Sequence, residues 1–376
     1  MTPPLRVLAV VPYYPPHVGG VERYAFALHD RLLRRPEVDH VTVVAPRLPP
    51  DAPVRDGDRR HRVLRYPAVE AVPNYPLPRG LPRAIGRALR GPHDVVVSHT
   101  RFFLTSFVAL GVARAIGAPL FHVEHGSAFV QLGGATGRVA LGYDRTLGRA
   151  LLRRADVLTA VSRAAAGFVE RVSGRRADVL YTGVAEEEVD GVEPNTELAA
   201  RFGERPLLAF AGRLLTSKGV DDLVEALGRL KRSDAVLVVV GDGPERSRLE
   251  AVAAPLGDRV AFLGALPHRE TVAVLKAADL VVNPSLTEGL PTAVVEAALC
   301  RRAVVATDVG GTAEALAEGE GGVLVAPRDP AALSEALDRL LEDPEERRRL
   351  GERAREGALR RFSWDRTVER FLELVP

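Results

Sequence analysis

The sequence predicts an α/β protein of two domains, each built on a parallel β-sheet with helices on its faces. Short apolar runs alternate with helical stretches along most of the 376 residues, the pattern of parallel strands joined through helices. This pattern stops in the acidic, polar segment 185–205 and starts again at Leu207, which indicates a linker between two similar halves. The length is sufficient for two separate cores.

The first half contains five expected strands, each a run of mainly apolar, often β-branched residues. They are expected at 5–11, 41–45, 95–98, 120–124 and 157–161, with helices at 24–34 and 104–116. Residues 47–80 are rich in Pro and Arg, and we expect an exposed excursion there with weak strands at most. Asp56 and Asp58 lie in it in a polar turn among arginines, so we interpret this acidic pair as surface rather than as a metal site.

The second half repeats the alternation. Its strands are expected at 207–211, 235–240, 260–263, 280–283 and 303–306. Helices are expected at 220–230, 292–299, 331–341, 345–359 and 364–374. We therefore expect a second parallel sheet followed by a helical C-terminal region.

One junction of the second half, residues 284–300, has the features of an anion site. A buried strand ends before it and a helix opens after it, which directs the backbone N–H groups of Gly289 and Leu290 beyond the strand end. Glu288 precedes the helix and Glu296 lies inside it. A carboxylate accepts two hydrogen bonds side by side, which suits a ribose diol at Glu296. A bound phosphate would repel Glu288, so we expect that carboxylate to face sugar hydroxyls or a developing positive charge. The alternative is that Glu288 complements the helix dipole and Glu296 is solvated.

Cations and glycines lie at other junctions. Arg213 and Lys218 flank the loop after strand 207–211, where two cations and a helix N-terminus can stabilise a diphosphate; the alternative is a pair of solvated charges. Gly241 opens a loop dense in Gly and Pro, which is a tight turn first and a ligand loop second.

The first half offers two more candidates. Gly19 and Gly20 follow the first strand and allow the backbone to approach a ligand closely, although a plain tight turn also explains them. His125 stands at the carboxyl end of a strand beside Gly126, where open sheets bind ligands. The alternative is a loop histidine whose hydrogen bonds stay within the protein.

Together these residues resemble the signature of the retaining glycosyltransferases of family 4, in which two glutamates are spaced as Glu288 and Glu296 are. That family has the GT-B architecture, in which two Rossmann-like domains face each other across a cleft and a C-terminal helix returns to the first domain. The resemblance implies an acceptor-binding domain at 1–190, a nucleotide-sugar-binding domain at 191–360 and the returning helix at 361–376.

The resemblance also implies roles for single residues. The implied catalytic set contacts the transferred sugar and the leaving diphosphate, and consists of His125, Glu288, Arg213 and Lys218. The implied donor-binding set surrounds the nucleotide and its phosphates, and consists of Gly19, Gly20, Arg213, Lys218, Gly241, Gly289, Leu290 and Glu296.

The expected activity is transfer of a hexosyl group from a nucleotide-diphosphate sugar to a hydroxyl acceptor, with retention of configuration. We expect a lipid-linked acceptor or a cell-envelope glycan. No metal is expected, because cationic side chains hold the diphosphate, and no cofactor is expected besides the donor substrate. Two alternatives remain: a sugar-nucleotide epimerase and a non-catalytic sugar-nucleotide binder of the same fold.

The net charge of +2 hides an asymmetry between the halves. Residues 1–183 carry 26 Arg against 14 Asp and Glu, and residues 184–376 carry 25 Lys and Arg against 35 Asp and Glu. Within the first half, arginines repeat at helical spacing beside leucine and isoleucine, in two stripes: Arg79, Arg83, Arg87 and Arg90, and Arg145, Arg149 and Arg153. Such stripes suit a helix on an anionic membrane surface, and two solvated helix faces are the alternative. Nucleic acid is not an expected partner.

Bulk composition is that of an ordinary globular protein, with 46% hydrophobic and 27% charged residues. Cys300 is the only cysteine, so no intrachain disulfide can form. No apolar run reaches the length of a membrane span, and no signal-peptide pattern is present. We therefore expect a cytoplasmic protein, with peripheral attachment to the inner face of the plasma membrane as the corollary of the basic stripes.

Overall fold

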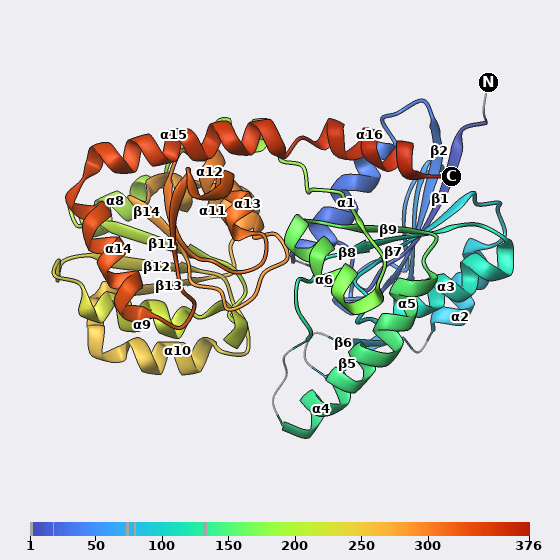
Figure 1. Cartoon of the computed structure of the whole chain (residues 1–376), viewed down its shortest axis with the longest axis horizontal. Coiled ribbons are helices and arrows are strands. Elements are labelled where there is room, and N and C mark those ends of the chain that lie inside the picture. Colours follow the sequence, from blue (N-terminus) through green and yellow to red (C-terminus); the bar gives the residue numbers. More distant parts are fainter. Residues whose placement is uncertain (1–2, 18, 73–74, 79, 131–133) are drawn as a thin grey trace. The chain divides into compact units, whose positions relative to one another are not determined.

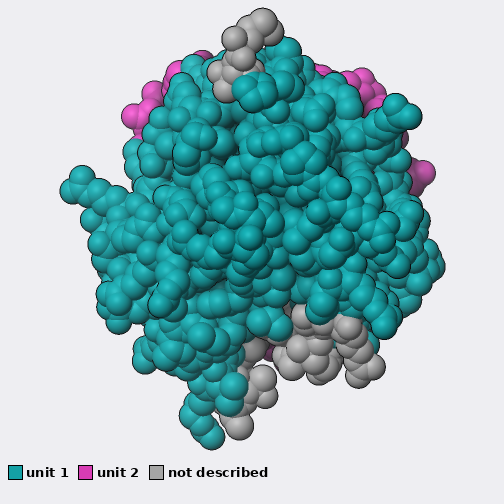
Figure 2. Space-filling model, turned by 90° about the vertical axis from the view of Figure 1, so that its right-hand side faces the viewer, with its two compact units in different colours: residues 1–183, 364–376 teal, residues 184–363 magenta. Residues whose placement is uncertain are grey.

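The computed structural model describes residues 3–17, 19–72, 75–78, 80–130 and 134–376. The chain divides into two compact units, which we call unit 1, residues 1–183 with 364–376, and unit 2, residues 184–363 (Figure 2).

The first boundary between the units lies before the position expected from sequence, 190, so the short helix α7 (Glu186–Asp190) belongs to unit 2. Arg355 holds α7 there, because its Nη2 lies 2.5 Å from Glu186 Oε1 and 2.8 Å from Asp190 Oδ2.

Unit 1 is built on an eight-stranded sheet of order β10-β9-β8-β7-β1-β2-β4-β3. Its strands are β1 (Leu5–Val10), β2 (Val38–Pro46), β3 (Arg55–Gly57), β4 (His61–Tyr66), β7 (Val95–His99), β8 (Leu120–Glu124), β9 (Val157–Ala160) and β10 (Asp178–Val179). Neighbours are parallel except β3, which is antiparallel to β4. The strand order reverses between β1 and β7, the place where open α/β sheets bind ligands at the carboxyl ends of their strands.

The helices of unit 1 connect these strands, except α16 at the end of the chain (Figure 1). They are α1 (Gly20–Leu32), α2 (Leu81–Ala88), α3 (Leu104–Ile116), α4 (Gly134–Tyr143), α5 (Arg149–Arg154), α6 (Arg163–Ser173) and α16 (Trp364–Leu374). A π-helical turn, Asp144–Gly148, joins α4 to α5, and a hairpin pairs β5 (Ala68–Val72) with β6 (Tyr75–Pro78). Gly117 and Gly174 adopt the left-handed conformation that ends α3 and α6.

Helix α16 completes unit 1 from the far end of the sequence. It packs against α1, and the ring of Phe371 lies 4.4 Å from that of Phe121 in β8, with both side chains buried. The hydroxyl of Thr367 donates to the carbonyl oxygen of Tyr181 at 2.9 Å. Unit 1 is therefore assembled from two separate stretches of the chain.

The expectation of an exposed excursion at residues 47–80 is wrong in part. Strand β4 is a regular member of the main sheet, parallel to β2, and Leu64 and Tyr66 are buried. Arg65 is buried too, because its guanidinium donates to the carbonyl oxygens of Pro53 and Pro15. Because Arg65 interrupts the apolar residues of β4, a search for hydrophobic runs does not detect this strand.

The acidic pair lies on the surface, as expected. Strand β3, which contains Asp56, is exposed along its length. Asp58 Oδ1 accepts the backbone N–H groups of Arg60 and His61 at 2.7 and 2.8 Å, so this carboxylate stabilises a turn.

The two arginine stripes have different surroundings. On α2, Leu81 and Ile85 are buried in the core of unit 1, so the apolar side of that helix serves folding and is not available to a membrane. Leu151 of α5 is buried in the same core, whereas the side chain of Leu147 is 47% exposed. Arg79 lies outside the described residues.

Unit 2 is built on a six-stranded parallel sheet of order β13-β12-β11-β14-β15-β16. Its strands are β11 (Leu207–Ala211), β12 (Val236–Val240), β13 (Val260–Gly264), β14 (Leu280–Asn283), β15 (Ala303–Thr307) and β16 (Gly322–Val325). Strand β12, of sequence VLVVV, is buried along its whole length, as a sheet covered on both faces requires. Here the strand order reverses between β11 and β14.

Helices cover both faces of this sheet, with α9 and α10 on one side and α11 and α12 on the other (Figure 1). The helices are α7, α8 (Thr196–Phe202), α9 (Val220–Arg229), α10 (Arg246–Ala253), α11 (His268–Ala277), α12 (Thr292–Leu299), α13 (Thr312–Ala315), α14 (Pro330–Glu342) and α15 (Pro344–Arg361). Short 3-10 turns occupy Thr216–Lys218, Ala254–Arg259 and Ala317–Gly319. Among the described residues, no helix is long and apolar enough to cross a membrane.

Candidate functional site

Four loops of unit 2 meet at the carboxyl edge of its sheet, around the reversal between β11 and β14. They follow β11, β12, β14 and β15, at residues 212–219, 241–245, 284–291 and 308–311. Every second-half residue predicted from sequence to bind or act lies in them or in α12, so the topology brings these candidates to one edge of one sheet.

Glycines allow these loops to touch backbone to backbone. Gly241 has a φ of +133°, and a Cβ there would lie 1.9 Å from the carbonyl oxygen of Gly212. Gly219 has a φ of +60°, and a Cβ there would lie 2.2 Å from the carbonyl oxygen of Pro284. The loops after β14 and β15 are joined by a 3.0 Å hydrogen bond from the N–H of Gly311 to the carbonyl of Gly289. Close loop packing thus gives Gly241 a structural reason to be glycine.

Lys218 and Glu288 form an ion pair at the centre of this edge. Lys218 Nζ lies 2.6 Å from Glu288 Oε1, and the two side chains are 25% and 10% exposed. From sequence, Lys218 is assigned to the diphosphate and Glu288 to the sugar. If each residue has that role, the two expected subsites would lie side by side.

The buried hydroxyl of Ser285 lies within hydrogen-bond distance of Glu288. Ser285 Oγ lies 2.7 Å from Glu288 Oε1 and 2.8 Å from Asn283 Oδ1. One hydroxyl proton serves one acceptor at a time, and in the described part of the chain Asn283 Nδ2 is buried without a hydrogen-bond partner. An amide turned so that Nδ2 donates to Ser285 would leave the hydroxyl proton for Glu288. The Ser285 backbone is fixed in turn by the Thr307 hydroxyl, which donates to its carbonyl oxygen.

The remaining phosphate candidates lie on the same edge. Arg213 is half-buried in the loop after β11. Gly289 is half-buried and Leu290 buried, directly before α12, whose first turn has no side-chain cap. The N-terminal end of α12, with its backbone N–H groups, therefore follows closely after Glu288 along the chain.

Glu296 lies in α12, with a side chain that is 13% exposed. Its Oε1 is 3.8 Å from Nδ1 of His268, the first residue of α11, and Nε2 of the same ring is 3.5 Å from Glu188 Oε2. Sequence reasoning missed His268 and Glu188. Neither belongs to a motif, and only the packing of α7, α11 and α12 brings them to Glu296.

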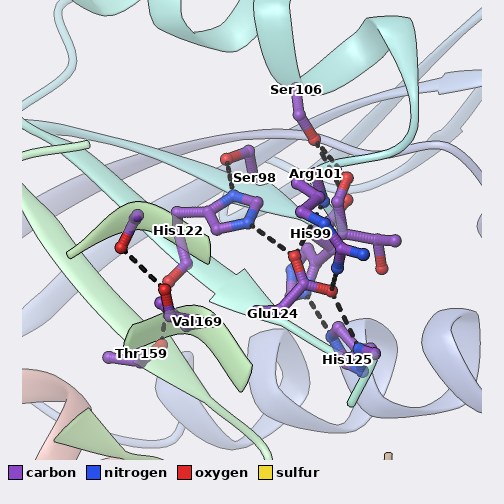
Figure 3. Close-up of polar contacts among 12 residues, drawn as sticks. Ser98, His99, Arg101, Ser106, His122, Glu124, His125, Thr159 and Val169 are labelled. Carbon is purple, nitrogen blue, oxygen red and sulfur yellow. Dashed lines mark hydrogen bonds and ion pairs between the residues drawn. The ribbon is translucent and has the colours of Figure 1, made fainter. Parts of the chain in front are cut away.

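In unit 1, His125 follows β8, is half-buried, and contacts buried polar side chains at the carboxyl edge (Figure 3). His99 Nδ1 and His125 Nε2 are 3.1 Å apart, and the Tyr24 ring meets the His125 ring edge-on at 4.9 Å. Burial lowers the pKa of His125 to about 4 and holds that of His99 well below its ordinary value. Both rings are therefore neutral at pH 7, and His125 can donate or accept a hydrogen bond without carrying charge.

Arg101, which sequence reasoning also missed, anchors the segment that carries His125. It is 2% exposed. Its Nη1 lies 3.0 Å from Glu124 Oε1, and its Nε lies 2.8 Å from Asp144 Oδ1. Burial alone raises the pKa of Glu124, but the Arg101 charge and hydrogen bonds from His122 and Gly126 outweigh it and hold that pKa well below its ordinary value. The Glu124 carboxylate thus fixes the turn after His125.

Gly19 and Gly20 lie at the junction of strand and helix, as expected, but α1 begins at Gly20, earlier than the expected start at residue 24. A carboxylate already covers this end of the helix. A Cβ on Gly19 would lie 2.6 Å from Glu22 Oε1, whereas Gly20 faces open space. Glu22 is buried, and the same oxygen is bonded to His17 Nδ1. A carboxylate over a helix N-terminus satisfies the dipole and repels a phosphate, so a diphosphate at Gly19 would require the Glu22 side chain to turn away.

No group of three or more His, Cys, Asp or Glu side chains placed to hold a metal ion occurs among the described residues. The unit 2 edge instead offers an ammonium, a guanidinium, a helix N-terminus and two carboxylates. This set can hold an anionic phosphate beside a group with hydroxyls.

Two family models match the chain. The model described as Glycosyltransferase Family 4 matches residues 18–188, and the model described as Glycosyl transferases group 1 matches residues 195–357. They fall on the two halves that the sequence pattern separates.

Similar proteins extend along nearly the whole chain. A D-inositol 3-phosphate glycosyltransferase of Xylanimonas cellulosilytica is 32% identical, over 95% of this chain and 91% of the relative. A GDP-mannose-dependent alpha-(1-6)-phosphatidylinositol monomannoside mannosyltransferase of Mycolicibacterium smegmatis is 30% identical, over 98% of each. The solved structure of Anabaena Alr3699/HepE in complex with UDP-glucose shares the fold, with a TM-score of 0.76 over 98% of each chain at 20% identity.

Proposed function

The chain belongs to the family 4 glycosyltransferases and has the GT-B fold of two Rossmann-like domains, and from this premise we propose that it transfers a sugar from a nucleotide-diphosphate sugar to a hydroxyl group, with retention of anomeric configuration. The observation that carries the proposal is the gathering of Arg213, Lys218 and Glu288 at the carboxyl edge where the unit 2 sheet reverses. Ligands of open α/β sheets bind at that position.

The diphosphate of the donor would bind Arg213, Lys218 and the N–H groups before α12. In the transition state the bond between C1 of the sugar and the phosphate oxygen breaks, and its electron pair passes to that oxygen. The acceptor oxygen bonds to C1 on the same face, and its proton goes to the departing phosphate. Cations at the diphosphate would lower the barrier by several kcal/mol in a desolvated site, and this is the reason why we propose a reaction without a metal ion.

Glu288 would serve the sugar end of the donor and Glu296 the ribose end. The Lys218–Glu288 contact of 2.6 Å would set the phosphate and sugar subsites next to each other. Glu296 has the two oxygens that a ribose diol needs. A nucleotide sugar as donor is supported by the relative named for GDP-mannose and by the Anabaena structure with UDP-glucose.

His125 would bond a hydroxyl of the transferred sugar, and its neutral ring suits that role. A charged imidazolium beside C1 would destabilise the positive charge that develops there in the transition state. A neutral ring orients the sugar without this cost. Gly19 and Gly20 would approach the diphosphate after rotation of Glu22.

We also propose a membrane-bound acceptor and peripheral attachment through unit 1. Val139 in α4 and Leu147 in the π-helical turn are 73% and 47% exposed. Arg138, Arg145 and Arg149 on the same helical segment are exposed too. A helical segment that exposes both apolar side chains and arginines suits the surface of an anionic bilayer. The mannosyltransferase relative, named for a phosphatidylinositol monomannoside, supports a lipid-linked acceptor.

Incubation of the protein with UDP-, GDP- and ADP-sugars and a panel of lipid-linked acceptors, followed by mass spectrometry, tests the activity, and NMR of the product tests retention. Lys218→Ala should abolish most turnover. Lys231→Ala removes an exposed lysine of the same unit and should not. Inversion at C1 would refute the mechanism, and product formed from donor alone would favour an epimerase. Binding of a sugar nucleotide without turnover of any acceptor would favour the non-catalytic binder.

A further inference from the structure

Two histidine rings meet where neighbouring strands of the unit 1 sheet end. His99 is the last residue of β7, and His125 directly follows β8, which pairs with β7 in parallel. His99 Nδ1 lies 3.1 Å from His125 Nε2 (Figure 3). Because an imidazole ring has two nitrogens, this contact leaves Nδ1 of His125 as the nitrogen that can serve a ligand.

His99 is the better fixed of the two rings. Its side chain is fully buried, whereas His125 is half-buried. The Ser106 hydroxyl donates to the carbonyl oxygen of His99 at 3.1 Å. The buried ring of Tyr24 packs edge-on against both histidines, with its centre 5.8 Å from that of His99 and 4.9 Å from that of His125. The hydrogen bond between the histidines therefore orients the His125 ring from a rigid neighbour.

The proton in this hydrogen bond can belong to either ring. Burial lowers the pKa of both, so each ring is neutral at pH 7 and has one N–H and one lone pair. In the first arrangement His99 Nδ1 donates, and His125 then has its own proton on Nδ1. In the second, His125 Nε2 donates, and His99 then has its own proton on Nε2. The two arrangements present opposite groups to a ligand of His125.

The far nitrogen of His99 distinguishes the two arrangements. In the described part of the chain, His99 Nε2 is buried and no protein group forms a hydrogen bond with it. The first arrangement places a lone pair at this atom, and the second places an N–H there. Buried N–H groups without an acceptor are rarer in proteins than buried acceptors without a donor. The environment of His99 therefore favours the first arrangement.

We propose that His99 is a positioning residue for sugar transfer, which holds Nε2 of His125 and selects the tautomer of His125 with its proton on Nδ1. His125 then donates a hydrogen bond from Nδ1 to an oxygen of the transferred sugar. An N–H cannot accept a hydrogen bond, so the sugar must offer a lone pair there, as a hydroxyl or a carboxylate oxygen does. The inference rests on the proposed function, since it takes His125 as a ligand of the sugar.

NMR of the full chain labelled with ¹⁵N-histidine, at pH 7.5, tests the tautomer. In a neutral imidazole, the ¹⁵N shift of the protonated nitrogen differs from that of the nitrogen with the lone pair. The signals of the two rings are those lost in the spectra of His99→Asn and His125→Gln. Both rings should have their proton on Nδ1. A proton on Nε2 of either ring would overturn the proposal.

The same spectra, recorded with ligands, test which nitrogen meets the sugar. UDP-glucose or GDP-mannose, once calorimetry shows that it binds, should shift the Nδ1 signal of His125, whereas UDP or GDP alone should not. A bound sugar nucleotide that leaves this signal unchanged would overturn the contact. Failure of the protein to bind either sugar nucleotide would overturn the donor class, and this inference with it.

Variants of His99 test its effect on turnover. His99→Leu cannot form a hydrogen bond, so His125 should also populate the tautomer with its proton on Nε2, and kcat should fall about three- to tenfold, the value of one hydrogen bond. Sugar-nucleotide affinity should change by less than about twofold, because the proposed phosphate and ribose ligands belong to unit 2. His99→Asn, whose amide N–H can replace that of Nδ1, should keep the tautomer and a kcat within about twofold of wild type.

The matched control is His93→Leu. His93 is a half-buried histidine of the same unit, and its Nε2 lies 3.0 Å from the carbonyl oxygen of Ala88. This variant should retain both the tautomer of His125 and the turnover. Full turnover in His99→Leu, or equal losses in His99→Leu and His99→Asn, would overturn the role of His99 alone. Thermal unfolding checks that each variant is folded, and the wild-type spectrum decides the tautomer without any variant of His99 in the sample.

Discussion

Replacement of Arg101 by Met should destabilise unit 1 more than any exposed arginine can. The guanidinium is 2% exposed and lies within 3.0 Å of both Glu124 and Asp144. It also lies 4.5 Å from the centre of the Phe168 ring. Met fills similar space but leaves two carboxylates buried without a cation.

The expected loss of unfolding free energy equals the cost of protonating a carboxylate that stays buried without a cation. Protonation of a carboxyl group with an ordinary pKa near 4 costs about 4 kcal/mol at pH 7, close to the 3–5 kcal/mol typical of a broken buried ion pair. In the wild type the pKa of Glu124 is lowered by folding, so its stabilising effect is present at neutral pH and is lost only as the solution becomes acidic. In the variant, a carboxyl group must take up a proton to stay buried. Each of the two that does so should reduce the penalty by about 1.4 kcal/mol for each unit of pH between 7 and 5.

The single tryptophan of the chain provides the assay. Trp364 is 9% exposed and belongs to unit 1, so its fluorescence reports the unfolding of that unit during a urea titration. Arg114→Met is the matched control, because Arg114 is 57% exposed and its Nη1 lies 3.4 Å from Asp156. It should cost less than about 1 kcal/mol. Equal losses for the two variants, or a loss for Arg101→Met that is the same at pH 5 and pH 7, would refute the reasoning.

Three further predictions concern the donor, metal ions and membranes. Glu296→Ala should weaken sugar-nucleotide binding by about 1.5–3 kcal/mol through lost charged hydrogen bonds, whereas Glu288→Ala should mainly lower kcat; calorimetry beside turnover assays checks this, and full activity in both variants would contradict it. Turnover should persist in EDTA because cationic side chains serve the diphosphate, and loss of activity that magnesium or manganese restores would show a metal requirement. Arg145→Glu with Arg149→Glu should lose binding to anionic vesicles at low salt, at about 1 kcal/mol for each arginine removed. In the same sedimentation assay Arg83→Glu should not, and a wild type that stays in solution would contradict membrane attachment.

Much of the fold is predictable because its signals are local. Helices α3 and α12 and strands β8, β11 and β14 occupy the residues that the pattern indicates. A mainly apolar stretch bounded by Gly, Pro or polar residues marks each one. Strand β4 was missed because its buried arginine interrupts that run.

The site is predictable as a set of residues and not as a set of contacts. Arg213, Lys218, Glu288 and Glu296 stand out by residue type at junctions of strands and helices. The pairing of Lys218 with Glu288 joins residues 70 apart in sequence. That of Glu296 with His268 depends on the packing of three helices. Distances of this kind are set by tertiary structure, and no local pattern encodes them.

The way α16 completes unit 1 has a consequence for biosynthesis. Phe121 is covered by Phe371, and Gly183 lies against the ring of Trp364, yet the ribosome makes α16 only after all of unit 2. Until then the nascent first unit displays an uncovered aromatic patch. Unit 2 is one continuous segment, 184–363, so its folding does not have to wait for a distant part of the chain. Nascent unit 1 is therefore the part of this chain most exposed to chaperones and to aggregation while translation proceeds.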